Sequence, residues 1–205
     1  MRFDWIDFGL SWRENWQEGT GSFETLRHNS TASLLASLLR GRLTPFSKVF
    51  CWLRQQPGVS EVGTSPKVRH IERTFPFVSY DAYDNDRLRL FADWLVETVA
   101  QAPELGISGD EAESLKAQLA AVDYAFTRTD KLKPTPEYSR CNIVYHHTPT
   151  KLSVRASCTL CDGRCIERDL DDPPFMRDEM VYGRAIGTCF EEKGILRLSS
   201  SRGVL

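Results

Sequence analysis

Three cysteines lie close together in this chain, at Cys158, Cys161 and Cys165. A Cys-x-x-Cys pair followed by a small turn, here Asp162-Gly163, lets two thiolates converge on one metal ion. A structural zinc ion takes four ligands, and the other candidates are Cys141, Cys165, Cys189, His146 and His147. We predict a structural zinc site whose ligands are Cys141, Cys158 and Cys161, completed by Cys165 or Cys189.

Two predicted strands, 141–147 and 152–158, explain how Cys141 reaches the Cys-x-x-Cys pair. The segment 148–151 between them, Thr-Pro-Thr-Lys, has proline second, as a type I turn favours. The resulting register puts Cys141 directly opposite Cys158, with β-carbons about 5 Å apart. It also makes one face mostly apolar, with His147 on it, and the other mostly polar, with His146 on it.

Other chemistry is compatible with the same cysteines. They can be ordinary buried thiols, or Cys141 and Cys158 can form a cross-strand disulfide. An iron–sulfur cluster fits less well, because the Cys-x2-Cys-x3-Cys run has one cysteine fewer than the bacterial ferredoxin run, although Cys189 could complete it.

Composition places the chain among soluble globular proteins. The 205 residues are 41% hydrophobic and 26% charged. Asp4 and Asp7 stand where a signal peptide would need a basic region and then an apolar run. No stretch approaches the roughly 20 apolar residues of a membrane span. We therefore expect a cytoplasmic protein without membrane contact, in which thiols stay reduced.

Charge is unevenly distributed along the chain, although the net charge is only −2. Residues 31–75 carry seven basic and two acidic side chains, whereas residues 76–130 carry four basic and eleven acidic ones. A basic block beside an acidic block suggests a polyanion site next to a differently charged surface.

The basic block contains a predicted order of elements. Ser30 can cap a helix that Gly41 ends, and Thr44-Pro45 can begin a second helix that continues to about Gln56. A β-hairpin over 59–73 is expected to follow. This order resembles a winged helix-turn-helix module over residues 30–75, and the resemblance implies that the 45–56 helix enters the major groove of DNA while the hairpin touches the backbone.

Nucleic-acid contacts are expected from this module. Side chains on the exposed face of the second helix would reach bases, and the basic residues around them would neutralise phosphates. The candidate residues are Arg40, Arg42, Lys48, Trp52, Arg54, Gln55, Lys67, Arg69 and Arg73. The same side chains could also only solvate a surface, or the module could bind protein.

The expected organisation is α+β. Residues 1–130 form a mainly helical part, which includes an acidic helical hairpin over 84–127 with a Ser108–Glu111 capping box. Residues 131–139, with Pro134 and Pro136, are the expected linker, and residues 140–205 the β-rich unit that carries the zinc site. Near the N-terminus, Trp5, Phe8, Trp12 and Trp16 fall along one helical stripe, typical of core or of a docking surface.

We find no catalytic motif. The Gly-x-Ser-x-Gly, P-loop and His-Glu-x-x-His patterns are absent from the sequence, although an unfamiliar site built on His146 stays open. We therefore expect a non-enzymatic nucleic-acid-binding protein, one subunit of a larger nucleoprotein complex. The alternative is a protein-interaction module, an adaptor, inhibitor or immunity-type protein, working through its aromatic N-terminus and acidic helices.

Overall fold

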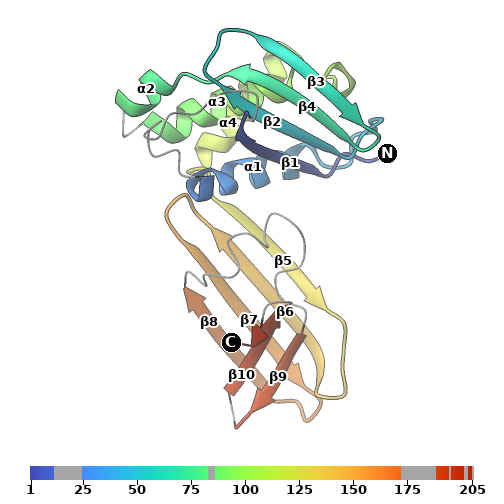
Figure 1. Cartoon of the computed structure of the whole chain (residues 1–205). Coiled ribbons are helices and arrows are strands. Elements are labelled where there is room, and N and C mark those ends of the chain that lie inside the picture. The colour runs from blue at the N-terminus through green and yellow to red at the C-terminus, as the bar shows by residue number, and fades with distance from the viewer. Residues whose placement is uncertain (12–24, 83–85, 172–187, 194, 201–202, 205) are drawn as a thin grey trace. The chain divides into compact units, whose positions relative to one another are not determined.

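The chain forms two compact units, Met1–Ala125 and Phe126–Leu205, each described by itself (Figure 1). The computed structural model describes residues 1–11, 25–82, 86–171, 188–193, 195–200 and 203–204. Among these described residues, strand content is 43% and helix content 30%, arranged around three sheets. The prediction of a mainly helical N-terminal part is therefore wrong, because strands begin near the N-terminus.

The first unit is built on a four-stranded sheet with the order β1-β2-β4-β3. Its strands are β1 (Trp5–Leu10), β2 (Lys48–Arg54), β3 (Val59–Ser65) and β4 (Val68–Thr74). β1, β2 and β4 run parallel, and β3 pairs antiparallel with β4. Helix α1 (Thr25–Leu39) lies in the connection between β1 and β2, as a parallel pair requires.

One face of this sheet carries the core. Ile6, Phe8, Val49, Leu53 and Ile71 are each at most 5% exposed and belong to one cluster with buried residues of the helices. Besides α1, the described helices are α2 (Phe77–Ala82), α3 (Arg87–Val99) and α4 (Gly109–Ala121), with a 3-10 turn at Pro103–Leu105. α1, α3 and α4 pack on one another, and α1 and α3 contact the sheet.

The winged helix-turn-helix prediction for residues 30–75 is wrong. The segment read as the recognition helix is strand β2, in which exposure alternates residue by residue along the chain. Val49, Cys51 and Leu53 face the core, whereas Phe50 lies on the opposite face. The spacing of Phe46, Phe50 and Leu53 suits a helix, but the two-residue period of a half-buried strand prevails, favoured by β-branched and aromatic residues.

Other predicted elements had mixed outcomes. A helix covers residues 30–39, but it begins earlier, at Thr25, so Ser30 lies within α1 and does not cap it. The 59–73 hairpin forms as β3 and β4. Ser108 caps α4 by accepting a hydrogen bond from the Glu111 amide at 3.2 Å. The predicted aromatic helical stripe begins instead in strand β1, and Trp12 and Trp16 lie outside the described residues.

The second unit contains two antiparallel sheets. The larger has the order β5-β6-β7-β8, and the smaller β11-β10-β9. Their strands are β5 (Phe126–Leu132), β6 (Tyr138–His147), β7 (Leu152–Leu160), β8 (Cys165–Asp171), β9 (Thr188–Glu192), β10 (Ile195–Ser200) and β11 (Gly203–Val204). The expected linker, 131–139, contains the end of β5 and the start of β6.

The β6–β7 hairpin has the predicted register. Cys141 pairs with Cys158, Ile143 with Ala156, and His147 with Leu152. His147 is 6% exposed on the apolar face, whereas His146 is exposed on the polar face. Alternation of apolar and polar residues was therefore sufficient to fix this pairing, since a shift by one residue would turn the apolar set to the other face.

Among the described residues, no helix is both long enough and apolar enough to span a membrane.

Because one face of β2 packs against the helices, truncating a side chain on that face should cost more stability than truncating an exposed one. Leu53→Ala should lower the free energy of unfolding by about 2–5 kcal/mol, because Leu53 is 0% exposed in the core. Leu43→Ala is the matched control. Leu43 is 81% exposed, so its truncation should change stability by less than about 0.5 kcal/mol. Urea unfolding followed by circular dichroism measures both, and equal losses would contradict this packing.

Candidate functional site

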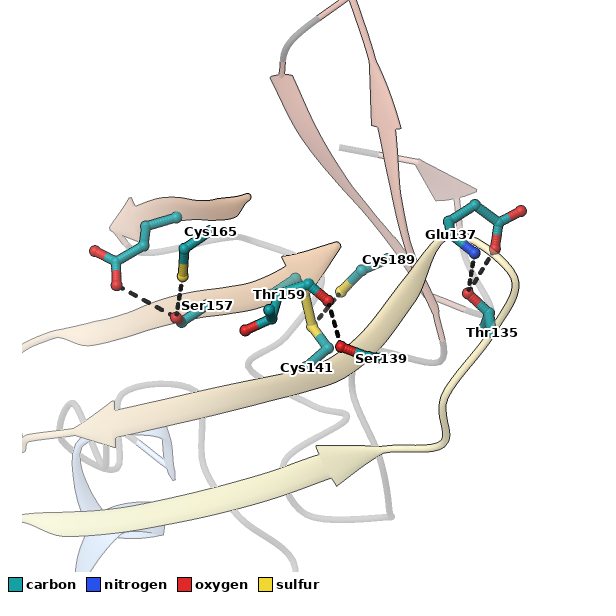
Figure 2. The surroundings of a disulfide bond; sticks show 10 residues. Thr135, Glu137, Ser139, Cys141, Ser157, Thr159, Cys165 and Cys189 are labelled. Carbon is teal, nitrogen blue, oxygen red and sulfur yellow. Dashed lines mark hydrogen bonds between the residues drawn. A yellow bond between two sulfur atoms is a disulfide. The ribbon is translucent and has the colours of Figure 1, made fainter. Parts of the chain in front are cut away.

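Three buried cysteines converge in the second unit. Cys141 and Cys158 form a disulfide across β6 and β7, and the Cys141 and Cys189 sulfurs lie 3.5 Å apart (Figure 2). All three sulfurs lie within 4.8 Å of one another, and none of the three residues is more than 3% exposed. Such a group could hold a metal ion when its thiols are reduced, because thiolates bind soft and borderline ions.

Two local features bring the sulfurs together. The β9–β10 hairpin places Cys189 on a buried face beside Leu196 and Leu198. In β6 an irregularity in pairing falls between Tyr138 and Arg140, so that Tyr138 and Cys141 are both buried. The Cys189 backbone N–H donates a hydrogen bond to the Tyr138 hydroxyl oxygen, which helps hold β9 against β6.

The remaining predicted metal ligands lie elsewhere. Cys161 is exposed in the turn after β7, and Cys165 is exposed on β8, where its sulfur lies 3.8 Å from the Ser157 hydroxyl (Figure 2). Cys165 pairs with Thr159 and so faces away from Cys158. His147 shares the buried face with Cys141 but lies six residues further along β6, about 20 Å away in an extended strand.

Burial controls the protonation of the third thiol. Removal from water raises the pKa of Cys189 to about 12, so it is a neutral thiol at physiological pH. A thiol of this kind is a poor nucleophile, because the thiolate is the reactive form. A metal ion that binds there has to displace the proton, which couples metal binding to pH.

The predicted nucleic-acid residues do not gather on one surface. Arg69 and Arg73 lie on the face of β4 that the helices cover, in register with Val49 and Leu53. Lys48, Trp52 and Arg54 lie on the opposite face of the sheet, on β2, and Gln55 follows the end of that strand. Lys67 lies in the β3–β4 turn, and Arg40 and Arg42 lie in the segment after α1.

All five arginines in this set form ion pairs within the first unit. Three of them join the basic block to the acidic helical region: Arg42 to Glu111, Arg69 to Glu104 at 3.5 Å and Arg73 to Glu97 at 2.5 Å. The other two are Arg40 with Asp4 at 2.9 Å and Arg54 with Glu72 at 4.0 Å. Three ion pairs therefore link the basic block of the sequence to the acidic block.

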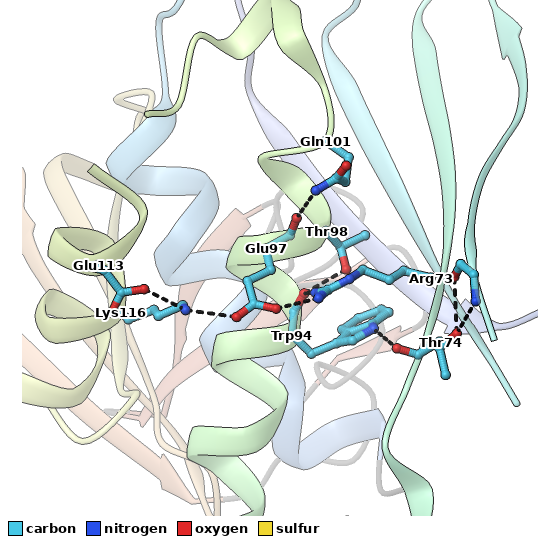
Figure 3. Close-up of polar contacts among 9 residues, drawn as sticks. Arg73, Thr74, Trp94, Glu97, Thr98, Gln101, Glu113 and Lys116 are labelled. Atoms are coloured by element: carbon cyan, nitrogen blue, oxygen red, sulfur yellow. Dashed lines mark hydrogen bonds and ion pairs between the residues drawn. The ribbon is translucent and has the colours of Figure 1, made fainter. Parts of the chain in front are cut away.

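One of these pairs belongs to a chain of polar contacts shown in Figure 3. Arg73 of β4 binds Glu97 of α3, and Glu97 also binds Lys116 of α4 at 2.9 Å. Burial tends to raise the pKa of Glu97, but hydrogen bonds from Lys116 and Arg73 outweigh it, so the net shift is downward. A cleft of about 600 Å³ lies beside this network. Two of the charged residues that line the cleft, Arg73 and Glu97, bind each other, which indicates a structural tie between sheet and helices.

The sheet face opposite the helices has a different chemistry. Phe50, Trp52 and His70 form a group of nearly parallel rings, with the Phe50 and Trp52 centroids 4.0 Å apart. All three side chains are half-buried. Gly9 of β1 lies under the group, where an added β-carbon would be 3.5 Å from the Phe50 ring. We call Phe50, Trp52 and His70 the aromatic face.

The charges around the aromatic face balance. Lys48 and Arg54 lie on the same side of the sheet as Asp7 and Glu72, which are 9% and 3% exposed. Glu72 accepts a hydrogen bond from the Ser11 hydroxyl at 2.6 Å. Burial is the main cause of a raised pKa at Asp7. This surface is apolar at its centre and near neutral around it.

Sequence reasoning assigned only part of this face. It named Trp52, as a nucleic-acid contact on a predicted helix. The signal that identifies the face is the alternation of Lys48, Phe50, Trp52 and Arg54 with the buried residues between them.

The surroundings of His146 give little support to a catalytic site. Its Nδ1 lies 3.0 Å from the Thr127 hydroxyl, and both side chains are exposed. A hydroxyl beside an imidazole is the first part of a nucleophilic site, but within the described ranges no carboxylate is seen to orient the other ring nitrogen.

Comparisons with protein-family models, with curated proteins and with solved structures find no match to this chain. The site must therefore be interpreted from its own geometry.

The His70–Trp52 contact predicts a pH effect. The Trp52 indole donates to His70 Nδ1 at 3.2 Å, which requires an unprotonated acceptor. Burial, and then the charge of Lys48, lower the pKa of His70 below its usual 6.5. The unfolded chain therefore binds more protons near that pH, and the contribution of His70 to stability is lost as the pH falls below about 6.5.

Urea unfolding at pH 7.5 and pH 5.5 measures this effect. His70→Gln removes the titrating group, so the variant should lose less stability on acidification than the wild type. An equal loss in the two proteins would show that His70 does not titrate as described.

Proposed function

We propose that this chain is a non-enzymatic binding protein that docks a protein partner through the aromatic face of its first unit. The observation that carries the proposal is the group of near-parallel, half-buried rings on the side of the sheet opposite the packed helices. Trp, other aromatic residues and Arg dominate the centres of protein interfaces, because they bury large areas with few rotatable bonds.

Charge favours a protein over a polyanion as the partner. Five arginines that could have neutralised phosphates already bind carboxylates of the same unit. The aromatic face has two cations and two carboxylates around it, so it lacks the excess positive charge that drives nucleic-acid binding. A partner with an apolar centre and mixed charges at its rim fits this surface.

Nucleic acid is the second candidate, and one observation favours it. Aromatic rings on an uncovered sheet face stack bases in several families of single-stranded RNA-binding domains. Lys67 is exposed in the adjacent β3–β4 turn and would supply a phosphate contact. The paired arginines make this candidate weaker than the protein partner.

A crosslinking experiment tests the proposed surface. A photoreactive amino acid replaces Lys48, beside the aromatic face, and a control protein carries it at Leu43, which is 81% exposed. In extracts of the source cells treated with nuclease, we expect a discrete protein adduct from position 48 and not from position 43. Once the partner is purified, Trp52→Ala should lower binding by about 2 kcal/mol or more, as for an interface hot spot.

Fluorescence anisotropy with single-stranded RNA and duplex DNA at several salt concentrations decides between the candidates. If binding weakens with salt and is lost in Lys48→Glu, nucleic acid becomes the favoured candidate in place of a protein partner. The absence of both adduct and nucleic-acid binding would contradict any binding role for this face.

We further propose that the buried cysteine group of the second unit holds a structural zinc ion in the reduced protein, as expected in the cytoplasm. Two thiolates on a tetrahedral zinc at about 2.3 Å each lie about 3.8 Å apart. With Cys141 in the disulfide, its sulfur already lies 3.5 Å from that of Cys189, so reduction leaves the two sulfurs close to this separation. Water would supply the fourth ligand.

Metal analysis of the reduced protein tests the zinc site. We expect one zinc ion per chain, and Cys189→Ser should weaken its binding by more than about tenfold, because it removes a direct ligand. Cys161→Ser is the matched control and should retain the metal, since Cys161 is exposed and outside the group. Zinc lost equally from both variants, or from neither, would contradict this ligand set.

A further inference from the structure

The disulfide and the metal site use the same sulfur atoms. Cys141 and Cys158 are bonded to each other, yet both belong to the group of three that could hold an ion. A zinc ligand must be a thiolate, and a disulfide sulfur has no negative charge to offer. The two states therefore exclude each other.

We propose that this cysteine group is a redox-controlled metal site, in which oxidation of Cys141 and Cys158 expels the ion. The inference rests on the zinc site proposed above and adds its regulation. Cys141 and Cys158 are the pair that oxidises, because they are directly opposite in the β6–β7 register and their sulfurs are bonded to each other. Cys189 comes from another sheet and is left as the third thiol.

The reaction balances with a two-electron oxidant such as hydrogen peroxide. The Cys141 and Cys158 thiolates lose one electron each and form the S–S bond. The O–O bond of the peroxide breaks, takes up those two electrons and, with two protons, gives two molecules of water. The zinc ion leaves with its charge unchanged, and the Cys189 thiolate takes up a proton. A dithiol reductant reduces the Cys141–Cys158 bond to two thiols and itself becomes a disulfide, and returning zinc then displaces the protons of the three thiols.

The two states connect the second unit differently. A metal ion held by all three sulfurs joins β9 of the smaller sheet to β6 and β7 of the larger one. The disulfide joins only β6 to β7, which the backbone ladder already pairs. Oxidation thus exchanges a link between two sheets for a bond within one sheet. What then holds β9 and β10 includes the Tyr138 contact and a hydrogen bond from Arg168 to the Leu196 carbonyl at 2.9 Å.

The two exposed cysteines provide an internal control. Cys161 and Cys165 lie outside the group and are accessible to the same oxidant. A double variant, Cys161→Ser with Cys165→Ser, keeps the three buried sulfurs and removes every exposed thiol among the described residues. If the buried group alone is the switch, this variant behaves as the wild type does.

The experiment uses the full chain, reduced and loaded with zinc alone, and adds hydrogen peroxide in steps. A chromogenic chelator measures released zinc, and mass spectrometry of alkylated peptides identifies the bonded cysteines. We expect one zinc released for each Cys141–Cys158 disulfide formed, with Cys189 alkylated as a free thiol, in both the wild type and the double variant. Hydrogen exchange in residues 188–200 should become faster after oxidation.

The possible failures are distinguishable. A reduced protein that binds no zinc would overturn the zinc site itself. If zinc binds but leaves without a Cys141–Cys158 disulfide, or stays bound while that disulfide forms, the site stands and its redox control is wrong. Release that depends on Cys161 or Cys165 would likewise assign the redox step to the exposed thiols.

Discussion

The pairing of β6 with β7 is the constraint on which the second unit depends. It puts Cys141 against Cys158, and it turns Ile143, Tyr145 and Val154 to the same buried side. The cysteine chemistry and the hydrophobic core are thus selected by one register, since a shift of one residue would expose both together. Residues such as His146, Ser153 and Arg155 lie on the polar side of the same hairpin. A change of register that moved the sulfurs apart would also lose the free energy of burying the core.

In the first unit the comparable constraint is electrostatic. The sheet supplies arginines and the helical region supplies carboxylates, and their pairing joins β4 to α3 and to the segment before α4. These pairs are partly exposed, so each contributes modestly to stability. Together they reduce the number of arginines that could bind an anionic ligand. The arginines of the basic block therefore have less positive charge to offer a ligand than the sequence alone suggests.

The sequence was informative where one periodicity dominates. The β6–β7 register and the Ser108 cap follow from patterns a few residues long, because the interactions that decide them are local. Segment 45–56 could not be decided in the same way, since Phe46, Phe50 and Leu53 fit a helix while residues 48–54 alternate as a strand. The choice depends on β1 and β4, which flank β2 but are distant from it in sequence. Which cysteines converge was also a long-range question, because Cys189 reaches Cys141 from 48 residues away.

The irregularity at the start of β6 has a consequence for how the chain can vary in length. One extra residue between Tyr138 and Cys141 lets both side chains face the interior. Removing it would not merely shorten a loop: it would rotate either the tyrosine or the cysteine, with everything beyond it, to the opposite side of the sheet. Insertions and deletions should be tolerated at the exposed 148–151 turn. At residues 139–140, adding or removing one residue would change which side chains lie beside Cys189.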